Sequence, residues 1–117
     1  MNKRAKGAAY ERLAAAFLQE QGSRILAANY RRPTGEIDLV AEEPDGTLAF
    51  IEVKYRSSTV YGYPSQAVDR KKQQRILRTA ALYLQETGLF HRPVRFDIVE
   101  ILGGRIRIIR NAFTASI

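Results

Sequence analysis

Two neighbouring apolar segments decide how this chain folds: Gly35-Glu36-Ile37-Asp38-Leu39-Val40-Ala41 and Leu48-Ala49-Phe50-Ile51-Glu52-Val53-Lys54. Both are rich in β-branched and aliphatic residues, and the turn-forming sequence Glu43-Pro44-Asp45-Gly46 separates them. This pattern predicts a β-hairpin. Strands as apolar as these should be largely buried, and a buried charge is costly unless it is paired, neutralised or bound to a metal. The charged residues on these strands are therefore the first candidates for a functional site.

The hydrophobic pattern also predicts the register of this hairpin, because side chains alternate between the two faces of a strand. Each strand carries one apolar set: Ile37, Leu39 and Ala41 on the first, and Ala49, Ile51 and Val53 on the second. If both sets face one core, Leu39 pairs with Ile51. An odd-numbered loop through Pro44-Asp45-Gly46, or a bulge, gives this register, whereas a two-residue Asp-Gly turn does not.

In this register four charged residues meet on the other face of the hairpin. Asp38 lies opposite Glu52, and Glu36 lies opposite Lys54. Directly opposed residues have Cβ atoms about 4.5–5.5 Å apart, which is close enough for two carboxylates to share a divalent cation. Oxygen ligands of this kind select Mg²⁺ or Mn²⁺. The carbonyl oxygen of Val53 is a further candidate ligand.

These residue types suit metal-dependent hydrolysis of a phosphodiester, with Asp38, Glu52 and Lys54 as the catalytic residues. A bound cation polarises the phosphate and lowers the pKa of a water molecule, and a lysine can orient that water or stabilise developing charge. The alternative is a structural salt bridge in which Lys54 neutralises Glu36 or Glu52. Three acids facing one lysine leave an excess of negative charge, and this excess favours a cation.

The composition points to a polyanionic partner. The 117 residues carry a net charge of +7 with a pI near 10.1, and 14 of the 19 basic residues are arginine, whose guanidinium binds phosphate through two parallel hydrogen bonds. We expect nucleic acid as the partner, with DNA as the first candidate. The predicted contact residues are Arg31, Arg56, Arg70, Lys71, Lys72, Arg75 and Arg78. The basic residues between 70 and 78 recur at helical spacing, so they form either a phosphate-binding face or a solvated one.

The remaining sequence predicts one α/β domain over residues 1–117. A helix is expected at 6–21 and strands at 25–31, 35–41 and 48–54. A second helix runs from an N-cap at Ser65 to about Thr87, where Gly88 ends it, and strands follow at 94–101 and 105–110. Cysteine is absent, which rules out disulfides and thiolate metal sites. No apolar run reaches the roughly 20 residues of a membrane span, so we expect a cytoplasmic protein that does not bind membranes.

The two hairpin segments, continued by Arg56, resemble the signature of the YraN-like family of small bacterial proteins. That family is grouped with the restriction-endonuclease-like nucleases and the archaeal Holliday junction resolvases. Further similar positions are Glu11, Ala14, Gly22, Ile25, Leu26, Asn29, Tyr30, Arg31, Tyr61, Gly62, Ala67, Val68, Lys71, Arg95, Phe96, Asp97, Asn111, Ala112 and Phe113. The similarity covers nearly the whole chain.

The resemblance implies a restriction-endonuclease-like αβββαβ core, a mixed sheet flanked by helices. It also implies that Asp38, Glu52 and Lys54 form a PD-(D/E)xK nuclease triad, and that Glu11 reaches the metal from the first helix. Resolvase-like nucleases cut two strands symmetrically, so a homodimer is implied as well.

The leading hypothesis is therefore a Mg²⁺-dependent DNA endonuclease, with branched DNA as a candidate substrate. Two alternatives belong to other classes of protein: a module of the same fold that binds DNA or RNA without turnover, and an interaction protein whose basic face binds RNA. The complete set of Asp38, Glu52 and Lys54 favours the nuclease, because buried acids that face phosphate bring no advantage to a protein that only binds it.

Overall fold

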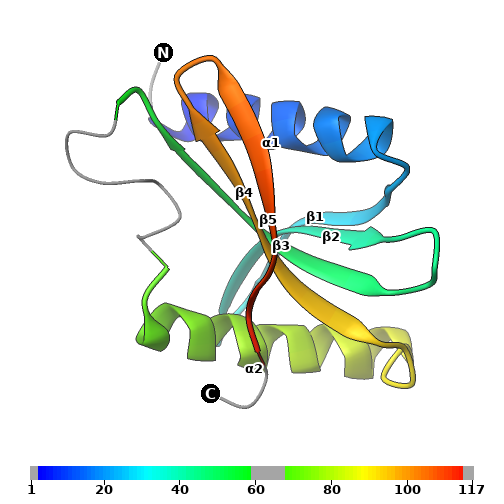
Figure 1. Cartoon of the computed structure of the whole chain (residues 1–117). Helices are drawn as coiled ribbons and strands as arrows, with labels where there is room; N and C mark the ends of the chain where they lie inside the picture. The colour runs from blue at the N-terminus through cyan, green and yellow to red at the C-terminus, as the bar shows by residue number, and fades with distance from the viewer. Residues whose placement is uncertain (1–2, 59–67, 115–117) are drawn as a thin grey trace.

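The structure is a computed structural model that describes residues 3–58 and 68–114 (Figure 1). Its elements are α1 (Lys3–Glu20), β1 (Arg24–Arg32), β2 (Gly35–Glu42), β3 (Leu48–Arg56), α2 (Arg70–Thr87), β4 (Val94–Leu102) and β5 (Arg105–Phe113). The five strands form one sheet in the spatial order β1-β2-β3-β4-β5. Among the described strands, only β3 and β4 are parallel, and α2 lies between them in the chain, as a parallel pair requires. The elements from α1 to β4 form the predicted αβββαβ core, and β5 extends the sheet.

The two helices cover opposite faces of the sheet (Figure 1). Beneath α1, Ala14 and Leu18 pack on a set of strand residues that we call the α1 core: Leu39, Ala41, Ala49, Ile51, Val53, Val99 and Ile101. Beneath α2, Ile76, Ala80 and Tyr83 pack on the α2 core: Ile37, Val40, Leu48, Phe50, Phe96, Ile98 and Phe113. Both faces of the central strands are therefore buried, and this explains why their sequences are almost continuously apolar.

The predicted hairpin register is confirmed. Leu39 pairs with Ile51, and the ladder continues to the pair of Glu42 and Leu48. The loop therefore consists of residues 43–47, an odd number as predicted. Gly46 has a φ of 90° in this loop, a value that glycine adopts without steric cost. Among the described residues the ladder between β2 and β3 begins at the Leu39–Ile51 pair. The backbone ladder between the two strands thus stops before the level of Asp38 and Glu52.

The alternation of side chains along β2 is interrupted at Asp38. Leu39 packs in the α1 core, whereas Ile37, two residues away, packs in the α2 core. The prediction that both face one core is therefore wrong for Ile37. On the neighbouring strand β1, Asn29 lies between the two β1–β2 residue pairs that flank Asp38, and its φ is 54°. Asparagine tolerates this conformation better than most residues. Both strands are irregular at the same level of the sheet.

The start of the second helix differs from the prediction. Its N-cap is Asp69, whose side chain accepts a hydrogen bond from the Lys72 backbone N–H, and the predicted N-cap Ser65 lies outside the described residues. The end of this helix is as predicted, since Gly88 is a left-handed C-cap with a φ of 72°. Neither of the two described helices is long and apolar enough to cross a membrane.

Candidate functional site

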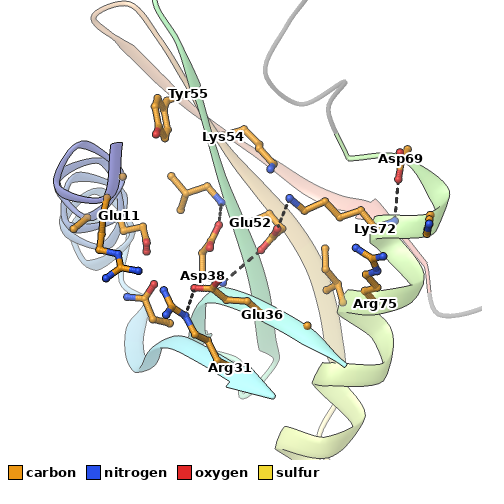
Figure 2. Close-up of a pocket in the computed structure, with 18 residues that line it drawn as sticks. Glu11, Arg31, Glu36, Asp38, Glu52, Lys54, Tyr55, Asp69, Lys72 and Arg75 are labelled. Carbon is orange, nitrogen blue, oxygen red and sulfur yellow. Dashed lines mark hydrogen bonds and ion pairs between the residues drawn. The ribbon is translucent and has the colours of Figure 1, made fainter. Parts of the chain in front are cut away.

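A groove of about 870 Å³ opens between the first halves of α1 and α2, where β2 and β3 separate (Figure 2). Its acidic lining residues are Glu11, Glu36, Asp38, Glu52 and Asp69, and its basic lining residues are Arg4, Arg31, Lys54, Lys71, Lys72 and Arg75. Carboxylates and cations thus line the same cavity.

The carboxylates of Asp38 and Glu52 are each held by the backbone of the other strand. Asp38 Oδ2 accepts a hydrogen bond from the Val53 N–H at 2.8 Å, and Glu52 Oε2 accepts a longer one from the Asp38 N–H at 3.4 Å. The end of the ladder explains this exchange, because these backbone donors have no strand partner there and buried donors must be satisfied. The break in the hairpin therefore brings the two acids together.

Burial and proximity make it difficult for both acids to be charged. Burial of Glu52, which is 4% exposed, and the neighbouring charge of Asp38 raise the pKa of Glu52 to about 8. Burial also raises the pKa of Asp38, followed by the charge of Glu36, although the hydrogen bond from Val53 opposes this. A divalent cation between the acids would supply the missing positive charge, so this pair fits a metal.

The metal would depend on few protein ligands. In the described part of the chain, no group of three or more histidine, cysteine, aspartate or glutamate side chains is arranged to hold an ion. Mg²⁺ is commonly bound by one or two carboxylates and keeps several water molecules. Asp38 and Glu52 match that mode rather than an all-protein cage.

Two lysines lie beside this acidic pair. Lys54 comes from β3, and Lys72 reaches in from α2 with its Nζ 3.6 Å from Glu52 Oε1 (Figure 2). Burial lowers the pKa of Lys54, and its contact with Lys72 lowers it further. Burial alone would lower the pKa of Lys72, but hydrogen bonding with Lys54 and the charges of Glu52 and Asp38 outweigh it, so the pKa is raised. Lys72 is therefore the more firmly charged of the two.

Glu11 lines the groove together with Glu36 and Arg31. When the Asn29 amide is oriented to satisfy its neighbours, its nitrogen donates to Glu11 Oε1 at 2.7 Å and to Glu36 Oε1 at 3.1 Å. Burial, followed by the charges of Asp38 and Glu36, raises the pKa of Glu11. Glu36 forms its ion pair with Arg31, at 3.1 Å. The prediction that Glu36 lies opposite Lys54 is not met by the described ladder, which ends before these residues.

Most of the predicted site residues line this groove. They are Glu11, Arg31, Glu36, Asp38, Glu52, Val53, Lys54, Lys71, Lys72 and Arg75. The other three predicted contact residues, Arg56, Arg70 and Arg78, lie outside its lining. Asn29, Arg4 and Asp69 also line it and were not predicted. Asn29 offered one sequence signal, since an asparagine within an apolar strand segment marks a site of left-handed backbone.

The fold and the paired acids are compatible with the restriction-endonuclease-like class. The chain belongs to the family described as "Uncharacterised protein family UPF0102", whose model matches residues 10–101. It is 49% identical over 116 residues to a UPF0102 protein of Lachnoclostridium phytofermentans, covering 98% of both chains. It is 43% identical to a UPF0102 protein of Persephonella marina, covering 92% of both chains, and 41% identical to one of Clostridioides difficile, covering 97% of this chain and 100% of the relative. The YraN-like resemblance is thereby confirmed.

Proposed function

We propose that this protein is a metal-dependent DNA endonuclease. The observation that carries the proposal is the pair formed by Asp38 and Glu52. The buried carboxylate of Glu52 and the half-buried carboxylate of Asp38 lie together where two strands separate. Each is held by the backbone opposite, at the floor of a groove with a basic rim. A site that disfavours two negative charges yet keeps two acids is best explained by a cation that binds both.

In this proposal Asp38 and Glu52 hold Mg²⁺ or Mn²⁺, with the Val53 carbonyl and Glu11 as further oxygen ligands. When bound, such an ion polarises a phosphate and lowers the pKa of a water molecule. Lys54 is half-buried and its pKa is lowered, so it suits the orientation of an attacking water and the acceptance of its proton.

The basic residues of the groove would bind the DNA backbone. Lys71 and Arg75 on α2, Arg31 on β1 and Arg4 on α1 stand around the acidic floor. They come from three elements, so a strand of DNA in the groove would meet cations on more than one side. Exposed cations around a catalytic floor position phosphates without reading base sequence. Branched DNA is a candidate substrate through the family resemblance.

One contact favours the alternative, a nucleic-acid-binding module without turnover. The ion pair between Lys72 and Glu52 gives this carboxylate a partner that does not require a metal. In such a module the acids and lysines would stabilise the fold, and Mg²⁺ or Mn²⁺ would have no effect on it.

Thermal melting and cleavage of wild type, Asp38→Asn and Lys54→Ala separate the two functions. For the nuclease, Mn²⁺ raises the Tm of the wild type, and branched or linear DNA is cut. Asp38→Asn should abolish cleavage and reduce the Mn²⁺ effect, while DNA binds equally or more tightly because a charge that repels phosphate is removed. Lys54→Ala should cut roughly 10²–10³-fold more slowly and still respond to Mn²⁺.

Asp45→Asn is the matched control, because Asp45 lies in the hairpin loop and its Oδ1 accepts from the Thr47 N–H, a contact that asparagine preserves. It should behave as wild type. A wild-type protein that neither gains Tm with Mn²⁺ nor cuts any form of DNA would exclude the nuclease and leave the binding module.

A further inference from the structure

Lys72 occupies a different environment from the other basic residues of α2. The sequence grouped it with Lys71 and Arg75 as one helical face, and both of these are exposed. The Lys72 side chain instead crosses to β3, where its Nζ lies 3.6 Å from Glu52 Oε1. Its side chain remains 39% exposed, whereas that of Glu52 is only 5% exposed. Lys72 therefore connects the buried acid to the open groove.

The position of Lys72 is fixed by the cap of the helix. Its backbone N–H donates to Asp69 Oδ1 at 2.9 Å, and the next turn is anchored by Ile76 in the α2 core. The backbone is thus held while the long side chain keeps rotational freedom. Lysine suits this arrangement, because its ammonium is a compact charge with three donors on a flexible stem.

We propose that Lys72 is a second lysine of the reaction centre, which contacts Glu52 in the metal-free protein and turns to the substrate phosphate when a divalent cation takes Glu52. This inference rests on the proposed function and makes the phosphate contact predicted for Lys72 dependent on the metal. The role is electrostatic, and no bond to Lys72 forms or breaks.

Geometry supports this exchange. An ammonium and a metal ion cannot both lie close to one carboxylate without repelling each other. The separation of 3.6 Å is longer than that of a charged hydrogen bond, about 2.7–2.9 Å, so the existing pair is loose. Lys72 already lines the groove, so its ammonium can leave Glu52 without leaving the cavity. Lys71 is next in sequence and exposed, whereas Lys72 is the residue that contacts Glu52, so Lys71 provides a matched control.

The first measurement is Mn²⁺ affinity by calorimetry for wild type, Lys72→Met and Lys71→Met. Removing a competing like charge should make Lys72→Met bind Mn²⁺ on the order of tenfold more tightly. Lys71→Met should stay within about twofold of wild type, because its charge is exposed and screened.

The second measurement is the DNA affinity of the same three proteins, first in the presence of EDTA and then in the presence of Ca²⁺. With EDTA, Lys72 is engaged with Glu52, so Lys72→Met should bind DNA within about twofold of wild type. With Ca²⁺, Lys72 contacts phosphate, and its loss should weaken binding about tenfold. Lys71→Met should weaken binding equally in both conditions. Lys72→Gln should give the same results as Lys72→Met and serves if the latter folds poorly.

Unchanged Mn²⁺ affinity in Lys72→Met, or an equal loss of DNA affinity with EDTA and with Ca²⁺, would overturn this inference. Neither measurement requires turnover. If the wild type binds Mn²⁺ but cuts no DNA, the nuclease proposal is refuted, and the two binding measurements still decide the role of Lys72.

Discussion

Asp38 shows how one polar residue reshapes an apolar strand. Its neighbours Ile37 and Leu39 pack in different cores, and its own carboxylate lies in the gap between two strands, bound to the Val53 N–H. A hydrophobic residue at this position would leave that N–H without a partner, and an unsatisfied buried donor costs about 1–3 kcal/mol. The side chain is thus part of the fold as well as of the proposed site.

The raised pKa of Glu52 makes stability depend on pH. The folded protein holds this proton up to about pH 8, whereas the unfolded chain releases it near 4.5. Because the folded state binds more protons in this range, the free energy of unfolding should fall as pH rises from about 4.5 to 8. The measurement is urea unfolding of metal-free protein across this range.

Glu52→Gln is the control, since glutamine has no titration in this range. Its stability should fall less with pH than that of wild type, and it should be the more stable protein at pH 8. Parallel pH profiles of the two proteins would contradict the raised pKa.

At the scale of the element, α2 begins where a side chain caps it. Asp69 Oδ1 accepts from the Lys72 N–H at 2.9 Å. Asp69→Ala should lower the free energy of unfolding by about 1 kcal/mol, because the first turn loses this partner. Asp69→Asn keeps the acceptor and should stay close to wild type. Chemical denaturation of the three proteins measures the difference, and an alanine variant as stable as wild type would show that the cap does not contribute.

The exposed face of α2 should set the salt dependence of DNA binding. Lys71 and Arg75 line the groove, and each phosphate contact contributes about 0.9 to the slope of log K against log salt through counterion release. Lys71→Ala and Arg75→Ala should each flatten the slope by about this amount. Arg24→Ala is the control, because Arg24 is exposed, pairs with Glu42 and lines a separate hollow at the hairpin end of the sheet. Unchanged slopes in both Lys71→Ala and Arg75→Ala would show that this face of α2 contacts solvent and not DNA.

At the scale of the whole molecule, the crossover from β3 through α2 to β4 assembles the groove. The two helices lie on opposite faces of the sheet, yet both begin on the same side of the molecule (Figure 1). Residues of their first halves therefore border one cavity: Gly7, Ala8 and Glu11 from α1, and Lys71, Lys72 and Arg75 from α2. The acids of β2 and β3 lie between them, where the sheet opens.

A homodimer stays a prediction that rests on the family resemblance. The isoleucines of β5 lie on both faces of the strand and pack within this chain, Ile106 and Ile108 against the α1 core and Ile109 against the α2 core. Two nuclease sites aimed at opposite strands still require two copies. Analytical ultracentrifugation with and without branched DNA should show a dimer, and a monomer at micromolar concentration in both conditions would exclude it.

The sequence by itself determined the hairpin, its register, the odd-numbered loop and the end of α2 at Gly88. Each of these follows from short-range rules: side chains alternate along a strand, and glycine permits turns that other residues resist. The start of α2 was misplaced because Ser65 and Asp69 are both good N-caps, and propensity alone does not choose between them.

Only the tertiary structure decided which partners the charges take. Arg31 rather than Lys54 pairs with Glu36, Ile37 crosses to the α2 core, and Lys72 leaves the predicted surface face for Glu52. Glu52 and Lys72 are 20 residues apart in the chain, and their distance is set by how α2 packs on the sheet. Spacing along the sequence reports which residues share an element, but packing between elements determines which charges meet.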